Sequence, residues 1–223
     1  MATLVFDVNE TLLDLRGLED LFFELFGDRS TAQDWFHLLL QLSMVSALTG
    51  VYRDFEHLGG DALRMIAQRR RVELSEARVE LLPAAMRNMP PHPDVKHALD
   101  RLRHAEHRLV ALSNSPYRLL NPQLENAGLA GFFDETLSVD EARTFKPDPR
   151  VYRMCAEKMG EPIEDLTMVA AHNWDITGAI RAGMKGAFVA RPGRLLGDAD
   201  ELPEMIVPDI GALADRLLHG VRF

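Results

Sequence analysis

Cysteine is almost absent from this chain of 223 residues, which contains only Cys155. A single cysteine excludes a disulfide within the chain and is typical of proteins from a reducing compartment. Cys155 lies between Met154 and Ala156 in a helical pattern, so we interpret it as a packing residue.

Long apolar runs are also missing from the sequence. No stretch approaches the roughly 20 apolar residues that a membrane-spanning helix needs, and the N-terminus has no basic segment and apolar run typical of a signal peptide. We therefore expect a cytoplasmic protein that does not bind membranes. Positive charge is in deficit as well, since a formal net charge of −9 argues against a nucleic-acid partner.

Apolar residues nevertheless make up 47% of the chain, enough for a sizeable core. From Leu15 to about Met89 their spacing is helical throughout, with breaks predicted at Gly27–Ser30 and at Gly59–Gly60. After the proline-rich segment 90–93, apolar strands alternate with helices.

The alternating part predicts an α/β fold. A first strand over residues 4–6 is followed by strands over 108–113, 133–139, 166–171 and 186–190 and by helices over 95–105, 119–127, 148–159, 174–182 and 210–218, with Asp209 as a helix cap. This pattern indicates a Rossmann-like parallel sheet with right-handed crossovers. We expect a catalytic core formed by residues 1–14 and 91–223, with an inserted helical cap domain over residues 15–90 that can exclude water from the site.

The stretch LVFDVNETLLD, Leu4 to Asp14, places Asp7 at the end of the first strand. Ligands of open α/β sheets bind outside the carboxyl ends of the strands, so Asp7 is a candidate covalent nucleophile. The alternative is an aspartate that caps the next turn. Other polar groups lie at the carboxyl ends of predicted strands or in the loops after them and can converge with Asp7 at the same edge, namely Ser113, Asn114, Lys146 and Asp175.

General chemistry suggests a role for each of these groups. Lys146 can hold Asp7 ionised and offset an anionic substrate. Ser113 and Asn114 can donate hydrogen bonds, and Asp175 can orient a water molecule or pair with Lys146. Taken singly, Ser113 and Asn114 could be a helix cap, Lys146 a solvated cation and Asp175 a first-turn helix residue. Their joint placement favours a site.

These stretches resemble the four ordered motifs of the haloacid dehalogenase-like superfamily, and FDVNETLLD, LSNSP, FKPDPRVY and HNWDITGA look most like its L-2-haloacid dehalogenase branch. The resemblance covers nearly the whole chain. It implies that Asp7 displaces halide from C2 of a short 2-haloalkanoic acid with inversion. Water then hydrolyses the aspartyl ester to a 2-hydroxy acid, without a cofactor. Lys146 and Asp175 would position and activate that water, while Ser113, Asn114 and loop amides would hold carboxylates.

The resemblance extends to three further positions. Thr11 would brace the nucleophile, and Tyr152 matches a tyrosine of the dehalogenase site, although it could be an aromatic residue on a helix face. Trp174 is typical of the dehalogenase branch. We place Tyr152, Trp174 and Asn9 among the substrate-binding residues, although an aromatic residue usually stands at the position of Asn9.

The sequence departs from the branch at three other functional positions. An arginine on the second cap helix usually receives the halide, but Phe36 or His37 stands there; we interpret Phe36 as cap core and His37 as solvated surface. Ser and Asn usually stand where this chain has Ala170 and His172. His172 could polarise the hydrolytic water, because an unperturbed imidazole titrates near neutrality, or it could be a hydrogen-bonded loop histidine.

Phosphatases of the superfamily carry two acidic residues that this chain lacks. One is a general acid two residues after the nucleophile, where Asn9 stands, and the other is a Mg²⁺ ligand at the position of Ala171. Mg²⁺ needs oxygen ligands, whereas a halide leaves without a proton or a metal, so we expect no metal. A phosphatase or other superfamily hydrolase with altered substrate, or a binding protein without turnover, are the alternatives. The apolar second cap helix could form a homodimer surface or be cap core.

Overall fold

The computed structural model describes residues 2–220, and six parallel strands form its central sheet in the order β3-β2-β1-β4-β5-β6. The strands are β1 (Thr3–Phe6), β2 (Arg108–Ser113), β3 (Glu135–Ser138), β4 (Leu166–Ala170), β5 (Lys185–Val189) and β6 (Met205–Val207). This order reverses direction beside β1, and in doubly wound sheets the ligand crevice lies at such a reversal. The carboxyl end of β1 is therefore the expected position of a site.

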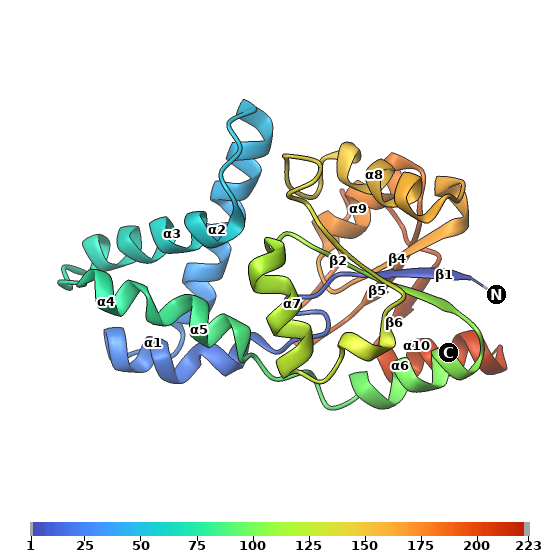
Figure 1. Cartoon of the computed structure of the whole chain (residues 1–223), viewed down its shortest axis with the longest axis horizontal. Coiled ribbons are helices and arrows are strands. Elements are labelled where there is room, and N and C mark those ends of the chain that lie inside the picture. The colour runs from blue at the N-terminus through green and yellow to red at the C-terminus, as the bar shows by residue number, and fades with distance from the viewer. Residues whose placement is uncertain (1, 221–223) are drawn as a thin grey trace.

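Helices cover both faces of the sheet, which confirms the predicted α/β class. Figure 1 shows α8 (Pro149–Met159) and α9 (Asn173–Ala182) on one side and α6 (Val95–His104) and α10 (Ile210–His219) on the other. Every residue of β1 and β4 is buried, as expected for strands covered on two faces. Cys155 on α8 is free and buried, and burial raises the pKa of its thiol to about 12, in agreement with a packing role.

A block of helices emerges from the loop after β1. It comprises η1 (Leu15–Leu18), α1 (Glu19–Phe26), α2 (Thr31–Thr49), α3 (Phe55–Arg70), α4 (Glu76–Val79) and α5 (Leu81–Arg87), and it lies beyond the end of the sheet opposite the N-terminus (Figure 1). The segments that enter and leave it meet at a bridge between Leu13 and Pro91. Residues 15–90 therefore connect to the sheet through one pair of neighbouring segments. The division into a cap over residues 15–90 and a core over residues 1–14 and 91–223 stays a prediction. The remaining helix, α7 (Tyr117–Asn126), follows β2.

One sequence prediction about these elements is wrong, and one strand was missed. The break expected at Gly59–Gly60 does not occur, because both glycines lie inside α3. The Trp35 indole of α2 donates a hydrogen bond to the Gly59 carbonyl at 2.9 Å, and a Cβ on Gly59 would lie 3.4 Å from the Trp35 ring. Glycine therefore serves close helix packing here. The edge strand β6 was not predicted, since a strand of three residues, of which only Val207 is buried, carries too little pattern.

The block is also less continuously helical than its apolar spacing predicts. Residues 51–54 and 72–75 are not helical, and Asp54 caps α3 by accepting a hydrogen bond from the His57 amide at 3.0 Å. Asp209, predicted as a cap, accepts from the Ala212 amide at 2.7 Å at the start of α10. Polar side chains that satisfy the first amides thus determine where helices begin.

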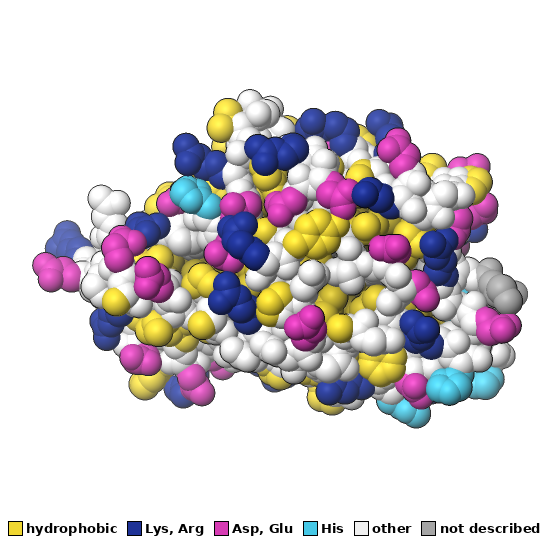
Figure 2. Space-filling model, viewed as in Figure 1, with side chains coloured by type: hydrophobic (Ala, Val, Ile, Leu, Met, Phe, Trp, Pro, Cys, Tyr) yellow, Lys and Arg dark blue, Asp and Glu magenta, His cyan; other side chains and the backbone are white. Residues whose placement is uncertain are grey.

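The surface carries dispersed charge. On the face shown in Figure 2, Lys and Arg side chains lie among Asp and Glu side chains, without the continuous basic surface typical of a nucleic-acid interface. Among residues 2–220, no helix is long and apolar enough to span a membrane. On α2, Val45 and Leu48 are exposed although much of the helix is buried. The helix therefore contributes to the cap core and also carries exposed apolar side chains, and a homodimer through it stays a prediction.

Candidate active site

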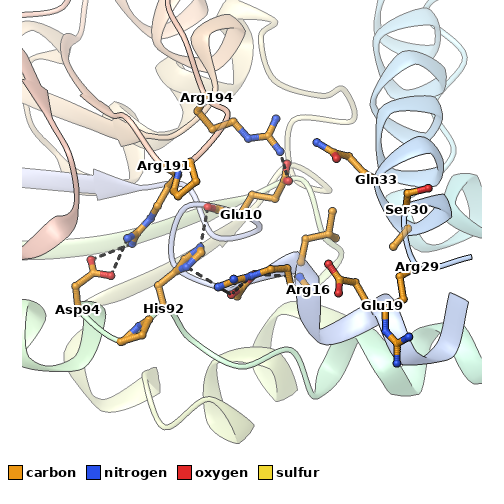
Figure 3. A pocket seen from close by; sticks show the side chains of 15 residues that line it. Glu10, Arg16, Glu19, Arg29, Ser30, Gln33, His92, Asp94, Arg191 and Arg194 are labelled. Carbon is orange, nitrogen blue, oxygen red and sulfur yellow. Dashed lines mark hydrogen bonds and ion pairs between the residues drawn. The ribbon is translucent and has the colours of Figure 1, made fainter. Parts of the chain in front are cut away.

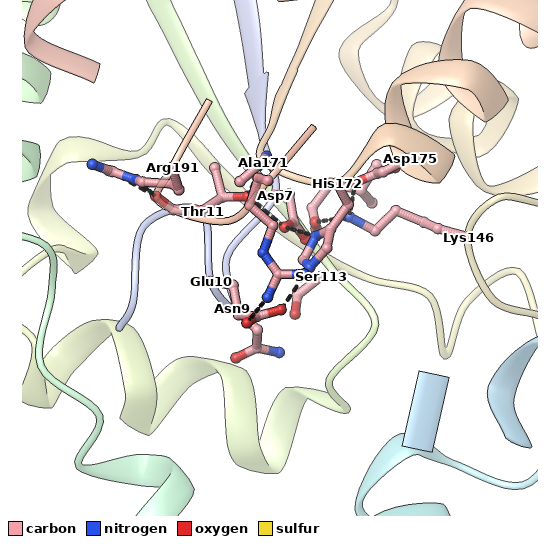
Figure 4. Close-up of polar contacts among 12 residues, drawn as sticks. Asp7, Asn9, Glu10, Thr11, Ser113, Lys146, Ala171, His172, Asp175 and Arg191 are labelled. Carbon is pink, nitrogen blue, oxygen red and sulfur yellow. Dashed lines mark hydrogen bonds and ion pairs between the residues drawn. The ribbon is translucent and has the colours of Figure 1, made fainter. Parts of the chain in front are cut away.

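Asp7 follows β1 directly and lies at the carboxyl edge of the sheet, as predicted (Figure 4). Its amide donates to the Val169 carbonyl on the neighbouring strand at 3.0 Å, and the residue is only 4% exposed. Thr11 donates its hydroxyl proton to Asp7 Oδ2 at 2.7 Å and accepts the Ala171 amide at 2.9 Å. Thr11 therefore fixes the orientation of the Asp7 carboxylate.

Lys146 lies beneath the Asp7 carboxylate and is 1% exposed, which excludes a solvated loop cation. Its Nζ donates to Asp7 Oδ1 at 2.8 Å, to Asp175 Oδ2 at 2.7 Å and to the Leu112 carbonyl at 3.1 Å. These three acceptors use all three ammonium protons. Lys146 is therefore a fixed cation shared by two buried carboxylates.

The charges of this cluster determine the ionisation of Asp7. Burial by itself would raise the pKa of Asp7, but the Lys146 ammonium and the hydrogen bond from His172 outweigh it and hold the pKa below its usual range. Burial would lower the pKa of Lys146, but Asp175 and Asp7 raise it. Burial raises the pKa of Asp175, against the charge of Lys146. Asp7 is therefore ionised at neutral pH, as a nucleophilic carboxylate must be.

Ser113 and Asn114 organise the loops around Lys146. Ser113 Oγ accepts the Ser115 amide at 3.1 Å, and Asn114 Oδ1 accepts the Lys146 amide at 3.1 Å. Neither caps α7, which begins after Pro116 without a side-chain cap. The hydroxyl proton of Ser113 and the amide protons of Asn114 are thus the groups that could bind a substrate carboxylate.

Two predicted substrate-binding residues contact the protein rather than an open cavity. Tyr152 is fully buried and donates its hydroxyl to Asp175 Oδ1 at 2.7 Å. Asn9 donates to Ser115 Oγ at 3.2 Å and accepts from Gln123 Nε2 at 3.1 Å. This geometry favours supporting roles for both, because their polar atoms already have partners.

His172 connects Asp7 to a residue that the sequence analysis did not select, Glu10. The His172 Nδ1 lies 3.2 Å from Asp7 Oδ2, and its Nε2 lies 2.8 Å from Glu10 Oε2. Arg194 pairs with the other oxygen of Glu10. Glu10 is 8% exposed, and its φ of 64° lies in the left-handed region, which non-glycine residues adopt only where other contacts hold them.

Two cavities approach this cluster from different sides. Glu10 and Arg194 line one of about 460 Å³ beside α1 and the start of α2 (Figure 3), and His172, Trp174 and Arg194 line another of about 520 Å³ beside α2. Trp174 stacks on the His172 ring with centroids 4.9 Å apart. Asp7 itself lines neither cavity, whereas residues of the Glu10–His172–Arg194 cluster line both.

The helix α2 brings no arginine to these cavities in the described part of the chain. Phe36 is 2% exposed and stacks on His172 with centroids 6.1 Å apart, so it is cap core as predicted. His37 is exposed and lines the second cavity. Arg194, which lines both cavities, forms an ion pair with Glu10 in the loop after β1.

His172 carries a positive charge at neutral pH. Burial would lower the pKa of His172, but its hydrogen bonds to Asp7 and Glu10 raise the pKa from 6.5 to about 9. Both ring nitrogens then donate protons, one to each carboxylate. In this resting state His172 is a cationic clamp on Asp7 rather than a base.

The free energy of unfolding should depend on pH through His172. Since its pKa is higher in the folded chain, its contacts stabilise fully below pH 6.5, and that contribution is lost as the pH rises through about 9. We expect the stability advantage of the wild type over His172→Gln to shrink by about 3 kcal/mol between these limits. Urea unfolding at several pH values measures it, and a constant difference would contradict the assignment.

The sequence contained a signal for the residues that were missed. Glu10 lies between Asn9 and Thr11 in the loop already singled out, and Arg191 and Arg194 follow β5 at the same sheet edge as Asp7. Arg191 donates to the Thr11 carbonyl at 2.9 Å and is 7% exposed. The rule that selected Asp7, a polar residue just after a parallel strand, would have selected Arg191, and Arg194 lies further along the same loop.

Comparisons with known proteins agree with this arrangement. Residues 1–183 match the family of haloacid dehalogenase-like hydrolases. The (S)-2-haloacid dehalogenase H-109 of Pseudomonas putida is 29% identical over 217 residues, which are 96% of this chain and 97% of that protein. An (S)-2-haloacid dehalogenase of Xanthobacter autotrophicus is 31% identical over 193 residues, 86% of this chain and 76% of that protein.

Solved structures extend the similarity to three dimensions. An L-2-haloacid dehalogenase from Xanthobacter autotrophicus matches with a TM-score of 0.93 and 27% identity, over 99% of this chain and 100% of that one. A structure of that enzyme with chloropropionic acid covalently bound matches with a TM-score of 0.92, 26% identity and the same coverage. Since the family match spans both the loop that carries Asp7 and the Asp175 region, the chain belongs to the haloacid dehalogenase-like hydrolase family.

Proposed function

We propose that this protein is a hydrolytic dehalogenase that converts short 2-haloalkanoic acids to 2-hydroxy acids and halide through an ester on Asp7. The observation that carries the proposal is the buried, ionised Asp7 carboxylate held between Lys146 and Thr11. Curated relatives named (S)-2-haloacid dehalogenase support it, as does the similar enzyme with covalently bound chloropropionic acid. We expect preference for the (S) substrate, with inversion at C2.

The first step uses the lone pairs of Asp7 Oδ1. This oxygen accepts one hydrogen bond, from Lys146, whereas Oδ2 accepts from both Thr11 and His172. Oδ1 is therefore freer to attack C2, and the halogen leaves with the bonding electron pair. The hydroxyl of Ser113 and the amide of Asn114 bind the substrate carboxylate in this proposal.

The second step returns Asp7 to its starting state. Water attacks Cγ of the ester, and the negative charge of the tetrahedral intermediate develops on Oδ2, where Thr11 already donates a proton at 2.7 Å. Collapse releases the 2-hydroxy acid, whose hydroxyl takes one proton of the water, and Asp7 retains the oxygen of the water; the complete reaction liberates one proton. Lys146 stabilises the restored carboxylate.

The residues present do not fit the Mg²⁺ site of a phosphatase. Asn9 is bound to Ser115 and Gln123, Ala171 has no side-chain oxygen, and Asp175 is paired with Lys146. Among residues 2–220, no group of three His, Cys, Asp or Glu side chains is placed to hold a metal ion. The donor set therefore favours displacement of a halide over metal-assisted phosphoryl transfer.

Halide release tests the proposal. Chloroacetate, fluoroacetate and each enantiomer of 2-chloropropionate are assayed in the presence of a chelator, and a single turnover in heavy-oxygen water is analysed by mass spectrometry. We expect halide release in chelator and label in Asp7. Phosphate release that needs Mg²⁺, or a ligand-induced rise in melting temperature without turnover, would contradict the proposal and favour a phosphatase or a binding protein.

A further inference from the structure

We propose that His172 is the base that activates water for hydrolysis of the Asp7 ester, and that Glu10 is the positioning residue that selects the ring nitrogen used. The inference rests on the proposed function and adds to it a residue pair, Glu10 and His172, linked at 2.8 Å. The contacts from Glu10 to His172 and from His172 to Asp7 connect a carboxylate, an imidazole and a reacting group in series.

The contacts of the Asp7 carboxylate support His172 by elimination. The groups that contact it in the described chain are Lys146, Thr11 and His172. All three protons of Lys146 are donated to carboxylates or a carbonyl, and Thr11 donates to Asp7 while accepting the Ala171 amide. Of these groups, only the imidazole can release a proton and change from donor to acceptor when the negative charge of Asp7 is lost.

Ester formation itself provides that change. The positive charge of His172 is stabilised by two carboxylates, Asp7 and Glu10, and the ester on Asp7 is neutral. Loss of one anionic partner favours release of the Nδ1 proton to solvent, which is the proton that the overall reaction liberates. The hydrogen bond to Glu10 keeps the remaining proton on Nε2 of His172. The lone pair of the neutral ring is therefore on Nδ1, which faces the ester.

The hydrolytic step then balances. Water attacks Cγ while Nδ1 of His172 takes its proton, and the same proton passes to the departing 2-hydroxy acid oxygen. The acid form of Asp7 next transfers its proton to Nδ1, which restores the ionised pair of the resting site. One water is consumed, and one proton has gone to solvent with the halide.

The surroundings of His172 suit this role. Phe36 from α2 and Trp174 from α9 stack on the ring at centroid distances of 6.1 and 4.9 Å and limit access of bulk water. Arg194, from the loop after β5, pairs with the second oxygen of Glu10 and fixes its carboxylate. The left-handed backbone of Glu10 is a strained conformation that its contacts to His172 and Arg194 maintain.

Rapid-quench turnover of 2-chloropropionate, followed by intact mass spectrometry, separates the two steps. In His172→Gly we expect one equivalent of halide in a burst and accumulation of the Asp7 ester, with hydrolysis slowed about 100-fold or more. Added imidazole should restore hydrolysis. In Glu10→Gln the slowing should be smaller, because the amide oxygen still accepts from Nε2, and in Glu10→Gly it should be larger.

Glu106 provides the matched control. It is exposed and also has a left-handed backbone, with φ of 60° against 64° for Glu10. Glu106→Gln and Glu106→Gly should hydrolyse the ester at the wild-type rate. Because Glu10→Gln keeps the hydrogen bond but removes the charge that supports the imidazolium, the pH dependence of ester hydrolysis should also shift to lower pH in that variant.

The outcomes are distinguishable. Equal slowing of halide release and ester hydrolysis in the His172 and Glu10 variants, without rescue by imidazole, would overturn the inference and indicate a structural role. Unchanged ester hydrolysis would also overturn it and favour activation by Lys146 and Asp175. If the wild type forms neither halide nor ester, the proposed function fails instead.

Discussion

Replacement of Asp7 by Asn should abolish ester formation and lower halide release from 2-chloropropionate by about 10⁴-fold or more, the loss expected when a covalent nucleophile is removed. The amide is uncharged and a poor nucleophile. In the wild type, Thr11 and His172 both donate to Oδ2 of Asp7. An amide NH₂ at that position would place a donor against these two donors. Halide release and intact mass after incubation with substrate measure the two effects.

A matched control for this variant lies at the amino-terminal ends of the strands, on the side of the sheet away from Asp7. Asp165 is exposed and directly precedes β4, so Asp165→Asn should retain wild-type activity. Cooperative thermal unfolding of Asp7→Asn would show that the loss is chemical. Halide release by a folded Asp7→Asn protein at more than about a tenth of the wild-type rate would contradict a nucleophilic role for Asp7.

Replacement of Lys146 by Met should lower the free energy of unfolding by about 3–5 kcal/mol at pH 7 and remove most activity. The reason is that Asp7 and Asp175 would remain buried without the cation that they share, and removal of one partner from a buried ion pair has this typical cost. Methionine retains much of the side-chain volume, so a cavity contributes little. Urea unfolding measures the change.

The pH dependence separates charge from packing in this variant. Without Lys146, the pKa values of the two carboxyls should rise, so protonation at lower pH relieves the repulsion. The stability difference between wild type and Lys146→Met should therefore shrink between pH 7 and about pH 5. Lys185→Met, at an exposed residue that begins β5, should change stability by less than about 1 kcal/mol. An equal Lys146→Met loss at both pH values would contradict the electrostatic explanation.

The strand-end chemistry could be predicted because it depends on local pattern and on one rule of topology. Apolar runs followed by Asp7, Ser113 and Lys146 indicate parallel strands or their loops, and carboxyl ends of parallel strands share one edge. The site cluster then follows from the sheet alone. Departures such as Asn9 and Ala171 could be interpreted chemically, since they lack metal-binding carboxylates.

Contacts between distant segments could not be predicted in this way. Gly59 was taken for a helix break because its partner, Trp35, is brought to it by packing of α2 on α3. Tyr152 was expected to bind substrate, yet its hydroxyl bonds to Asp175 from the neighbouring helix. A local pattern gives the spacing of side chains along one element, but it does not give the angle or distance between elements.

The amino-acid sequence by itself determined the fold class, the position of the candidate nucleophile Asp7 at the end of the first strand, and the absence of a phosphatase donor set, because these follow from periodicity and residue type. Only the tertiary structure joined Glu10, His172 and Arg194 into one chain of contacts to Asp7. These residues lie in three loops that follow different strands: Glu10 after β1, His172 after β4 and Arg194 after β5. The charge of His172 depends on how close two carboxylates approach it, and that distance exists only in the folded protein.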